Sequence, residues 1–145
     1  VIIYSEKARQ ENKTLLYDEP QEIVTIFGDR NRIRQVFINI IDNAIKYSTA
    51  YGHIIVATAV TDKAVIITVE DDGCGIEPER LKQILASLEI EKNTTKIGVF
   101  NIYQRLKLYY DDKFSFDIKS SLKKGTCITI SIPRESTAEP EGSIL

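Results

Sequence analysis

The sequence is poor in cysteine, proline and glycine, and it contains no long apolar segment. The two cysteines, Cys74 and Cys127, have no Cys-x-x-Cys spacing, so a disulfide scaffold is excluded and a reducing compartment is indicated. Four prolines and seven glycines in 145 residues are too few for a fibrous chain. No apolar run approaches the roughly 18 residues needed to span a bilayer. These absences favour a globular domain.

The sequence also lacks an excess of charge of either sign. Nineteen Lys and Arg face twenty-one Asp and Glu, which leaves a formal net charge of −2. This balance lacks the broad basic footprint of a dedicated nucleic-acid binder, so no nucleic acid is expected as a partner. A hydrophobic content of 43% over 145 residues supplies one core of ordinary size, and the length is about that of one domain.

Hydrophobic spacing predicts helices interspersed with two hairpins. Asp29 is a good N-cap for a strongly amphipathic helix that runs to Ser48. Further helices are expected over 79–88 and 98–110, and strands over 14–17, 54–60, 64–70, 114–119 and 126–132. This order is α+β and predicts a two-layer sandwich, with helices on one face of an antiparallel-rich sheet. The expected domain covers 14–133, with a lead-in over 1–13, a loop over 89–96 and a disordered tail over 134–145.

The first candidate for chemistry lies on the 30–48 helix. At about 100° per residue, Asn39, Asn43 and Lys46 fall on one stripe beside the apolar face, where they are expected to be half-buried. They could simply border a core helix. However, asparagines one turn apart are poor helix formers, and a position beside the core is costly without polar partners. Asparagine oxygen suits Mg²⁺, which usually shares its coordination shell with substrate phosphates.

Three loops add weaker signals. Residues 71–76 place a carboxylate, Asp71, at a strand end before Gly-x-Gly, where a ligand amino group could be bound between closely approaching backbone segments. The same stretch could be an ordinary acidic turn. Residues 94–101 lead through a polar loop to Gly98 at a helix start, which suits an anion, although such a junction is common. Gly125-Thr126 opens the last strand. Together, in this order, the four signals are specific.

The combination resembles the ATP-binding catalytic domain of sensor histidine kinases, in the GHKL (HATPase_c) superfamily shared with type II topoisomerases, MutL and heat-shock chaperone ATPases. Residues 39–48, Asn-Ile-Ile-Asp-Asn-Ala-Ile-Lys-Tyr-Ser, match the family's N box nearly residue for residue, and the resemblance covers about 12–133. Residues 97–101 also look like the LytS/YesM branch, so the subfamily is left open. The implied fold has three helices on a mixed, mainly antiparallel sheet, with ATP between the layers.

The resemblance also implies the composition of the ATP site. Asn43 would hold Mg²⁺ with Asn39 beside it, and Lys46 and Tyr47 would reach the phosphates. A lid over the triphosphate would close from the 94–101 segment. The implied ATP-binding residues are Asn39, Asn43, Lys46, Tyr47, Asp71, Gly73, Gly75, Ile76, Thr95, Lys96, Gly98, Val99 and Thr126.

At the other end of the site, Asp71 would accept a hydrogen bond from the adenine amino group, directly and through a water shared with Thr126. Gly73 and Gly75 would allow close approach, and Ile76 would line the adenine pocket. In the lid, Lys96 stands where the family often has the first glycine of Gly-x-Gly.

The resemblance favours transfer of the ATP γ-phosphate to a histidine. Hydrolysing members and anti-sigma-factor serine kinases carry a glutamate as general base where this chain has Asn39, which cannot take a proton. His53 is the only histidine, and its surroundings do not match a phosphoacceptor helix. The acceptor is therefore expected on a separate dimerisation domain, with residues 1–13 as the lead-in from its helix and a response regulator downstream.

Two other functions stay open. One is a nucleotide-binding or partner-docking module without turnover, and the other is an anti-sigma-type serine kinase. No catalytic residue is firmly assigned. Parent proteins of this family are often membrane-anchored sensors, and this part would face the cytoplasm without contacting the membrane.

Overall fold

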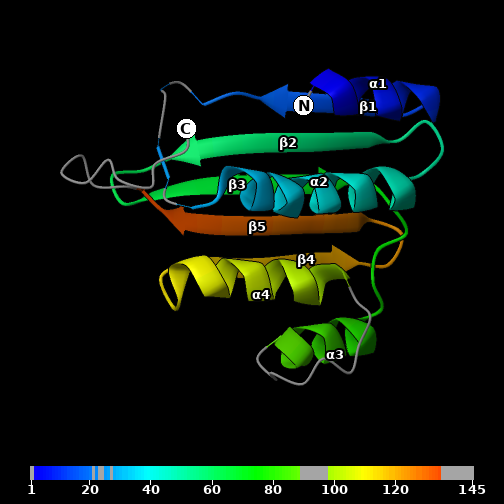
Figure 1. Cartoon of the computed structure of the whole chain (residues 1–145). Coiled ribbons are helices and arrows are strands. Elements are labelled where there is room, and N and C mark those ends of the chain that lie inside the picture. Colours follow the sequence, from blue (N-terminus) through cyan, green and yellow to red (C-terminus); the bar gives the residue numbers. More distant parts are fainter. Residues whose placement is uncertain (1, 21, 23–24, 27, 89–97, 135–145) are drawn as a thin grey trace.

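A single mixed sheet of five strands organises the fold (Figure 1). The computed structural model describes residues 2–20, 22, 25–26, 28–88 and 98–134. The strand order is β1-β2-β3-β5-β4; β1 pairs with β2 in parallel and every other pair is antiparallel. The strands are β1 (Thr14–Asp18), β2 (His53–Val60), β3 (Ala64–Asp71), β4 (Ser115–Ser121) and β5 (Gly125–Pro133). The helices are α1 (Ile2–Gln10), α2 (Arg30–Tyr47), α3 (Pro78–Leu88) and α4 (Gly98–Tyr110).

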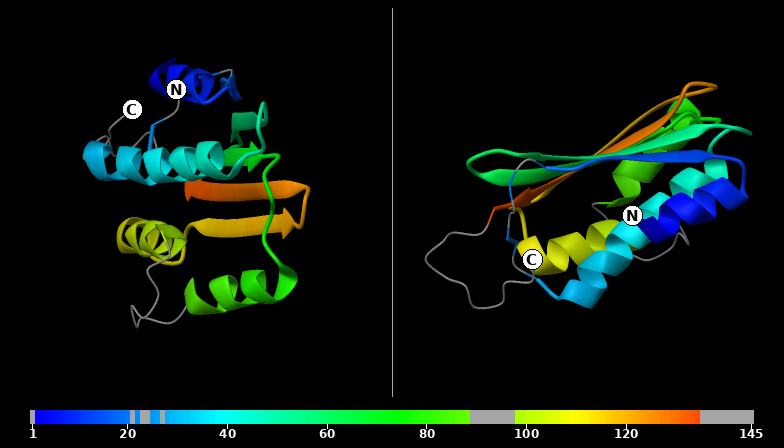
Figure 2. Two further views of the ribbon diagram at one scale, coloured as in Figure 1. Left: turned by 90° about the vertical axis from the view of Figure 1, so that its right-hand side faces the viewer. Right: turned by 90° about the horizontal axis from the view of Figure 1, so that it is seen from above.

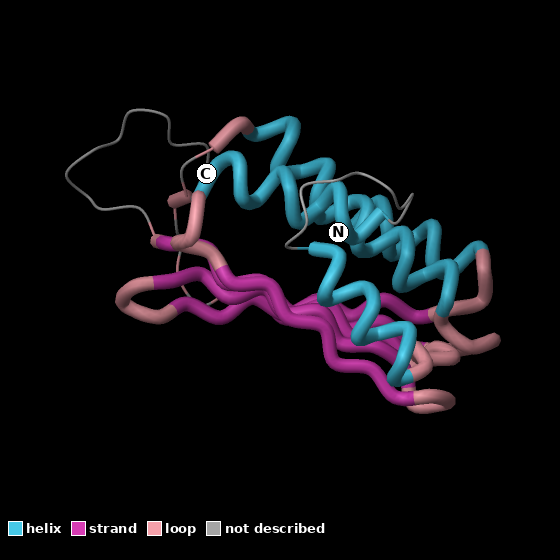
Figure 3. The backbone as a smooth tube through the Cα atoms, turned by 90° about the horizontal axis from the view of Figure 1, so that it is seen from below, coloured by secondary structure: helices cyan, strands magenta, loops and turns pink. Residues whose placement is uncertain are grey.

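The helices gather on one face of the sheet, as the side views in Figures 2 and 3 show. Alternation along the strands explains this arrangement, because successive side chains point to opposite faces. Ile54 and Val56 of β2 and Ile130 and Ile132 of β5 are buried toward the helices. Ile55, between two of them, is 41% exposed. The predicted two-layer α+β sandwich is confirmed.

The helix α2 is built as its sequence predicts. Asp29 accepts hydrogen bonds from the backbone N–H groups of Asn31 (3.0 Å) and Arg32 (3.1 Å), which satisfies two donors of the first turn. At the other end the Ser48 N–H donates to the Ala44 carbonyl, 3.0 Å away. The buried face consists of Ile33, Val36, Ile40, Ile41, Ala44 and Ile45. Because this face is buried, the rotation of α2 about its axis is fixed, and so is the position of Asn43 beside the buried face.

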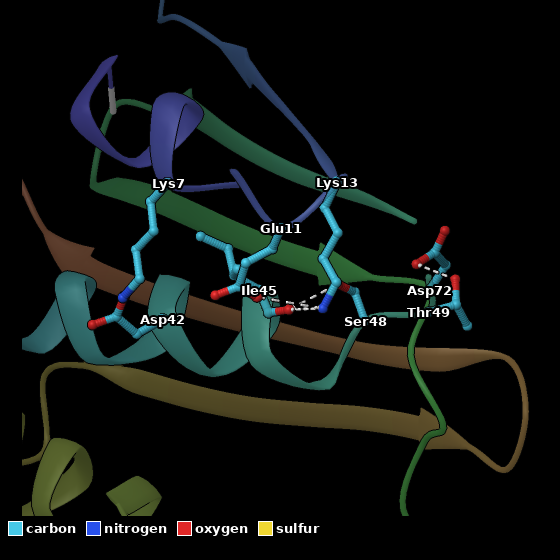
Figure 4. A network of polar contacts seen from close by, with 8 residues as sticks. All are labelled: Lys7, Glu11, Lys13, Asp42, Ile45, Ser48, Thr49 and Asp72. Atoms are coloured by element: carbon cyan, nitrogen blue, oxygen red, sulfur yellow. Dashed lines mark hydrogen bonds and ion pairs between the residues drawn. The ribbon is translucent and has the colours of Figure 1, made fainter. Parts of the chain in front are cut away.

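The expected lead-in over 1–13 contains a helix that packs on the domain, beside the three helices that were expected to cover the sheet. Residues 2–10 form α1, which packs on β1 and α2. Ala8 is fully buried in the main core, and Tyr4 packs against that core. Lys7 pairs with Asp42 of α2 at 2.6 Å, and the ammonium of Lys13 donates to the Ile45 carbonyl (Figure 4). Tyr4 and Ala8 alone form too short an apolar stripe for periodicity to show that this segment is part of the folded unit.

The remaining boundaries differ from prediction by one or two residues. β2 and β5 begin one residue earlier, and β4 extends to Ser121 because the hairpin that follows it is tight, with Lys124 N–H donating to the Ser121 carbonyl at 3.1 Å. The expected loop over 89–96 and nearly all of the expected tail lie outside the described residues. Across the described part of the chain, no helix combines the length and apolarity that a membrane crossing requires.

Candidate functional site

A cavity of about 610 Å³ opens between α2, the loop that follows β3, and α3. Its wall is mostly apolar, and its few polar groups come from separate elements. Such a combination is typical of small-molecule sites. The lining residues are Ile40, Asn43, Ala44, Tyr47, Val69, Asp71, Cys74, Gly75, Ile76, Glu77, Arg80, Ile84, Thr126 and Ile128.

Asp71 supplies the carboxylate of this cavity. It is the last residue of β3 and pairs in register with Ile54 of β2 and Thr126 of β5. Its Oδ1 accepts a hydrogen bond from the Gly73 N–H at 2.8 Å. Burial raises the pKa of Asp71 above its ordinary value, while hydrogen bonds from the Gly73 and Thr126 backbones act in the opposite direction. The result is a half-buried acceptor held in place by the backbone, suited to a ligand amino group.

The two glycines after Asp71 let the loop lie between other backbone segments. A Cβ on Gly73 would be 2.1 Å from the Tyr47 carbonyl oxygen. A Cβ on Gly75, whose φ is +74°, would be 1.9 Å from the carbonyl oxygen of Ser121. Gly75 lines the cavity and Gly73 does not. Close backbone packing therefore requires both glycines, and their contact with a ligand stays a prediction.

The α2 wall carries the predicted asparagine stripe. Asn43 lines the cavity with Tyr47, whereas Asn39 is half-buried beside it and its Oδ1 accepts from the Gln35 Nε2 at 2.9 Å. The expectation of half-burial is wrong for Lys46, which is exposed. Its Nζ lies 5.2 Å from the centre of the Tyr47 ring. A long side chain in the last helical turn can extend past the core edge into water.

Thr126 and Ile76 meet through a residue that the sequence did not reveal. Ser120 of β4 lies 2.8 Å from the Thr126 hydroxyl, and its Oγ accepts from the Ile76 N–H, also at 2.8 Å. Ile76 is 44 residues from Ser120 in the sequence. Thr126, in contrast, is its direct cross-strand partner in the β4–β5 register. A hairpin register would have placed Ser120 beside Thr126, but not beside Ile76.

Asp72 holds the cavity loop from its outer side. Its Oδ2 accepts from the His53 N–H at 2.9 Å, and Oδ1 accepts from the Thr49 hydroxyl at 3.2 Å (Figure 4). Burial raises the pKa of Asp72, but these hydrogen bonds outweigh it and hold that pKa below its ordinary value. His53 itself is exposed, with its Nδ1 3.6 Å from Asp72. Asp72 thus joins the turn after α2 to the loop after β3.

Between residues 74 and 84, sequence reasoning missed four lining residues. Cys74, for which the sequence indicated no role, is exposed and lines the cavity. Glu77, Arg80 and Ile84 also line it. Glu77 immediately precedes α3, and the three residues lie three and four positions apart, so the helical period could have placed them on one face.

The predicted lid could be placed only in part. Thr95 and Lys96 lie outside the described residues. Gly98 and Val99 form the first turn of α4, and the structure describes only their backbone. Among the residues that are described, no three His, Cys, Asp or Glu side chains cluster as metal ligands. The cavity lining includes the Asn43 amide, whose oxygen is of the kind that suits Mg²⁺.

Comparison with known families and sequences gives a consistent result. Residues 28–136 match the model of the histidine kinase-, DNA gyrase B- and HSP90-like ATPase family. An adaptive-response sensory kinase SasA from Rippkaea orientalis is 29% identical over 136 residues, which cover 90% of this chain and 34% of the relative. Sporulation kinase C from Bacillus subtilis is 35% identical over 112 residues, covering 77% and 26%. The chain thus spans about a third or less of these relatives.

Solved structures share the fold. The catalytic domain of histidine kinase ThkA superposes with a TM-score of 0.72 at 21% identity, covering 92% of this chain and 86% of that one. Full-length ShkA in complex with AMPPNP gives a TM-score of 0.72 at 22% identity, covering 96% and 29%. At these identities the likeness concerns the architecture, a helical layer on one mixed sheet.

Proposed function

Because this chain belongs to the histidine kinase-, DNA gyrase B- and HSP90-like ATPase family, we propose that it is the ATP-binding catalytic domain of a two-component sensor histidine kinase. In this proposal it transfers the ATP γ-phosphate to a histidine on a separate dimerisation domain of the same parent protein. A response regulator would receive the phosphoryl group next. The domain would work in the cytoplasm, and the parent protein would be a membrane-anchored sensor.

The observation that carries this proposal is the arrangement of polar groups around the cavity. Asp71 and Thr126 come from adjacent strands at one end, and Asn43 and Tyr47 come from α2 on the facing wall. The apolar side chains of Ile76 and Ile128 line the same cavity. An acceptor pair, an apolar slot and a separate oxygen ligand match a nucleotide that has an amino-bearing base and a metal-bound phosphate tail.

The residues present fit Mg-ATP. Asp71 would accept from the adenine amino group, Ile76 would contact the base, and the Asn43 amide oxygen would complete the Mg²⁺ shell next to the phosphates. Lys46 and Tyr47 would reach the phosphates from the end of α2. When bound, Mg-ATP supplies the phosphoryl group, and the metal neutralises charge on it during transfer.

Proton transfer is not required of this site. Asn39 occupies the place beside Asn43 where a carboxylate base could activate water, and an amide cannot accept that proton. An imidazole acceptor is already a nucleophile, so positioning and charge neutralisation are enough. The only histidine of the chain, His53, is 62% exposed at the start of β2 and does not line the cavity. This supports an acceptor supplied by another domain.

The main competing function is a nucleotide-binding or docking module without turnover. Its support is Lys96, which replaces a lid glycine and restricts the backbone where closure is expected. A serine kinase of the anti-sigma type is disfavoured by Asn39. The three functions differ in whether phosphate leaves ATP and which side chain receives it.

Calorimetric titration of the chain with a non-hydrolysable ATP analogue, with and without Mg²⁺, tests the site. We expect binding that depends on Mg²⁺. The chain is then mixed with labelled ATP and a histidine-bearing dimerisation domain from the parent protein. Acid-labile phosphorylation of that domain, absent when its histidine is replaced by alanine, would establish the kinase. Binding without transfer would favour the docking module, and no binding would contradict the site.

A further inference from the structure

We propose that Ser120 is a positioning residue that fixes the direction of the Thr126 hydroxyl, so that the base end of the cavity selects a 6-amino purine over a 6-oxo purine. The inference rests on the proposed function, because it names a determinant of base choice at the same site. Ser120 does not line the cavity and would not touch the nucleotide. It would act through Thr126, which does line it.

Ser120 stands where three elements meet. Its Oγ accepts from the Ile76 backbone N–H at 2.8 Å. The same hydroxyl donates to the Gly125 carbonyl at 3.0 Å and lies 2.8 Å from the Thr126 Oγ1. These contacts join β4 to the start of β5 and to the loop that follows Asp71. Ser120 is itself partly buried, so competition from water is limited.

Counting hydroxyl protons fixes the direction of the third contact. A serine hydroxyl has one proton to donate and two lone pairs that accept. If the proton of Ser120 goes to the Gly125 carbonyl, Thr126 must donate its own proton to Ser120. All three contacts can be hydrogen bonds only in this arrangement. The Thr126 oxygen then has only lone pairs left to offer to the cavity.

The base end therefore presents acceptors. Asp71 offers a carboxylate, and Thr126 beside it offers an oxygen without a free proton. A 6-amino purine brings N–H donors to these acceptors. A 6-oxo purine brings a carbonyl oxygen instead, and an acceptor facing acceptors is left unpaired at a desolvation cost. Removal of Ser120 would release the Thr126 proton, which could then be donated to a 6-oxo group.

The experiment measures the dissociation constants of Mg-ATP and Mg-ITP for the unchanged chain and for Ser120→Ala. We expect the unchanged chain to prefer ATP. Loss of one hydrogen bond changes an equilibrium about threefold to tenfold, so the ATP preference should fall by about that factor in Ser120→Ala. Ser120→Thr keeps the hydroxyl and should keep the preference. Ser121→Ala is the matched control, because Ser121 is exposed on the same strand.

The ratio of the two constants separates positioning from mere packing. An unchanged ratio of the two dissociation constants in Ser120→Ala would overturn the proposal, whether ATP and ITP bind as before or are weakened equally. In a Thr126→Val background the effect of Ser120→Ala on the ratio should disappear, and its persistence would also overturn the proposal. If Ser120→Ala fails to fold, Ser120→Cys gives the same test with a weak donor of similar size. Failure of the unchanged chain to bind Mg-ATP would overturn the proposed function instead.

Discussion

The two ends of the cavity are built in different ways. At the base end, Asp71 and Thr126 sit on neighbouring strands, and backbone hydrogen bonds from Gly73 and the Ser120 contacts hold the polar atoms in place. At the other end the groups are side chains of one helix. Asn43 and Tyr47 line the cavity there, whereas the exposed Lys46 and Asn39, whose 2.9 Å hydrogen bond goes to Gln35, lie outside the lining.

This difference indicates where the site is preorganised. Groups fixed by strand register and backbone hydrogen bonds lose little freedom when a ligand binds, whereas long side chains such as that of Lys46 must be ordered. The base end should therefore be sensitive to small changes in backbone geometry. The α2 end should respond mainly through charge and metal.

The largest effect is expected where the base end depends on backbone geometry. Gly75→Ala forces a side chain into a position with φ of +74° and a backbone oxygen 1.9 Å away. We expect a loss of about 3 kcal/mol in the free energy of unfolding, measured by urea denaturation. Cys74→Ala, at the exposed neighbouring position, should stay within about 0.5 kcal/mol of the parent. A Gly75→Ala chain as stable as the parent would show that this loop is not rigidly packed.

The next effect distinguishes a residue that contacts the ligand, Asp71, from a neighbour that only supports the loop, Asp72. Asp71→Asn removes the charge of the acceptor, and hydrogen bonds to charged groups contribute about 1.5–3 kcal/mol, so ATP affinity should fall about 10-fold to 100-fold. Asp72→Asn is the control, since its amide oxygen can still accept from the His53 N–H, its amide nitrogen can donate to the Thr49 hydroxyl, and the residue does not line the cavity. Its affinity in the same calorimetric titration should be close to that of the parent. Equal losses of affinity in both variants would show that Asp71 does not contact the ligand directly.

The same contrast explains what could be predicted from the sequence. The span and buried face of α2 followed from the Asp29 cap and the apolar stripe, and Asp71 before Gly-x-Gly marked a loop. Both are local patterns. The packing of Ala8 in the core and the contact of Ser120 with Ile76 depend on how distant segments meet. No period or motif carries that information, and the expected lid falls mostly outside the described residues.

The α2 end should show a metal-dependent effect. Asn43→Ala removes the amide oxygen proposed for Mg²⁺ but leaves the base contacts intact. We expect an affinity loss of about 10-fold with Mg²⁺, equivalent to one lost ligand contact of about 1.4 kcal/mol, and little change without Mg²⁺. Asn31→Ala, the same substitution at an exposed position in the first turn of the same helix, is the control. An equal loss with and without the metal would assign Asn43 to the nucleotide rather than to Mg²⁺.

The smallest expected effect is the pH dependence of stability that comes from the ionisation of Asp71. Because burial raises its pKa above 3.8, the folded chain protonates Asp71 at a higher pH than the unfolded chain does. Ionised Asp71 therefore costs folding free energy above that raised pKa, and the cost disappears as pH falls below 3.8. The neighbouring Asp72 has the opposite sign. Its lowered pKa stabilises the fold above 3.8, and this contribution is lost as pH falls through the folded value.

The pH dependence of nucleotide affinity should reflect the protonation of Asp71 and not that of Asp72. Protonation removes the carboxylate acceptor, so the amino-group contact should weaken as pH falls toward the raised pKa. The measurement is the affinity ratio of ATP to purine riboside triphosphate between about pH 4 and pH 7, a range that begins just above the ordinary aspartate pKa of about 3.9 and extends in the direction of the Asp71 shift. Both ligands carry the same phosphates, so their titration cancels in the ratio. A ratio that falls with pH locates the amino group at Asp71, whereas a constant ratio would show that the α2 end accounts for the affinity.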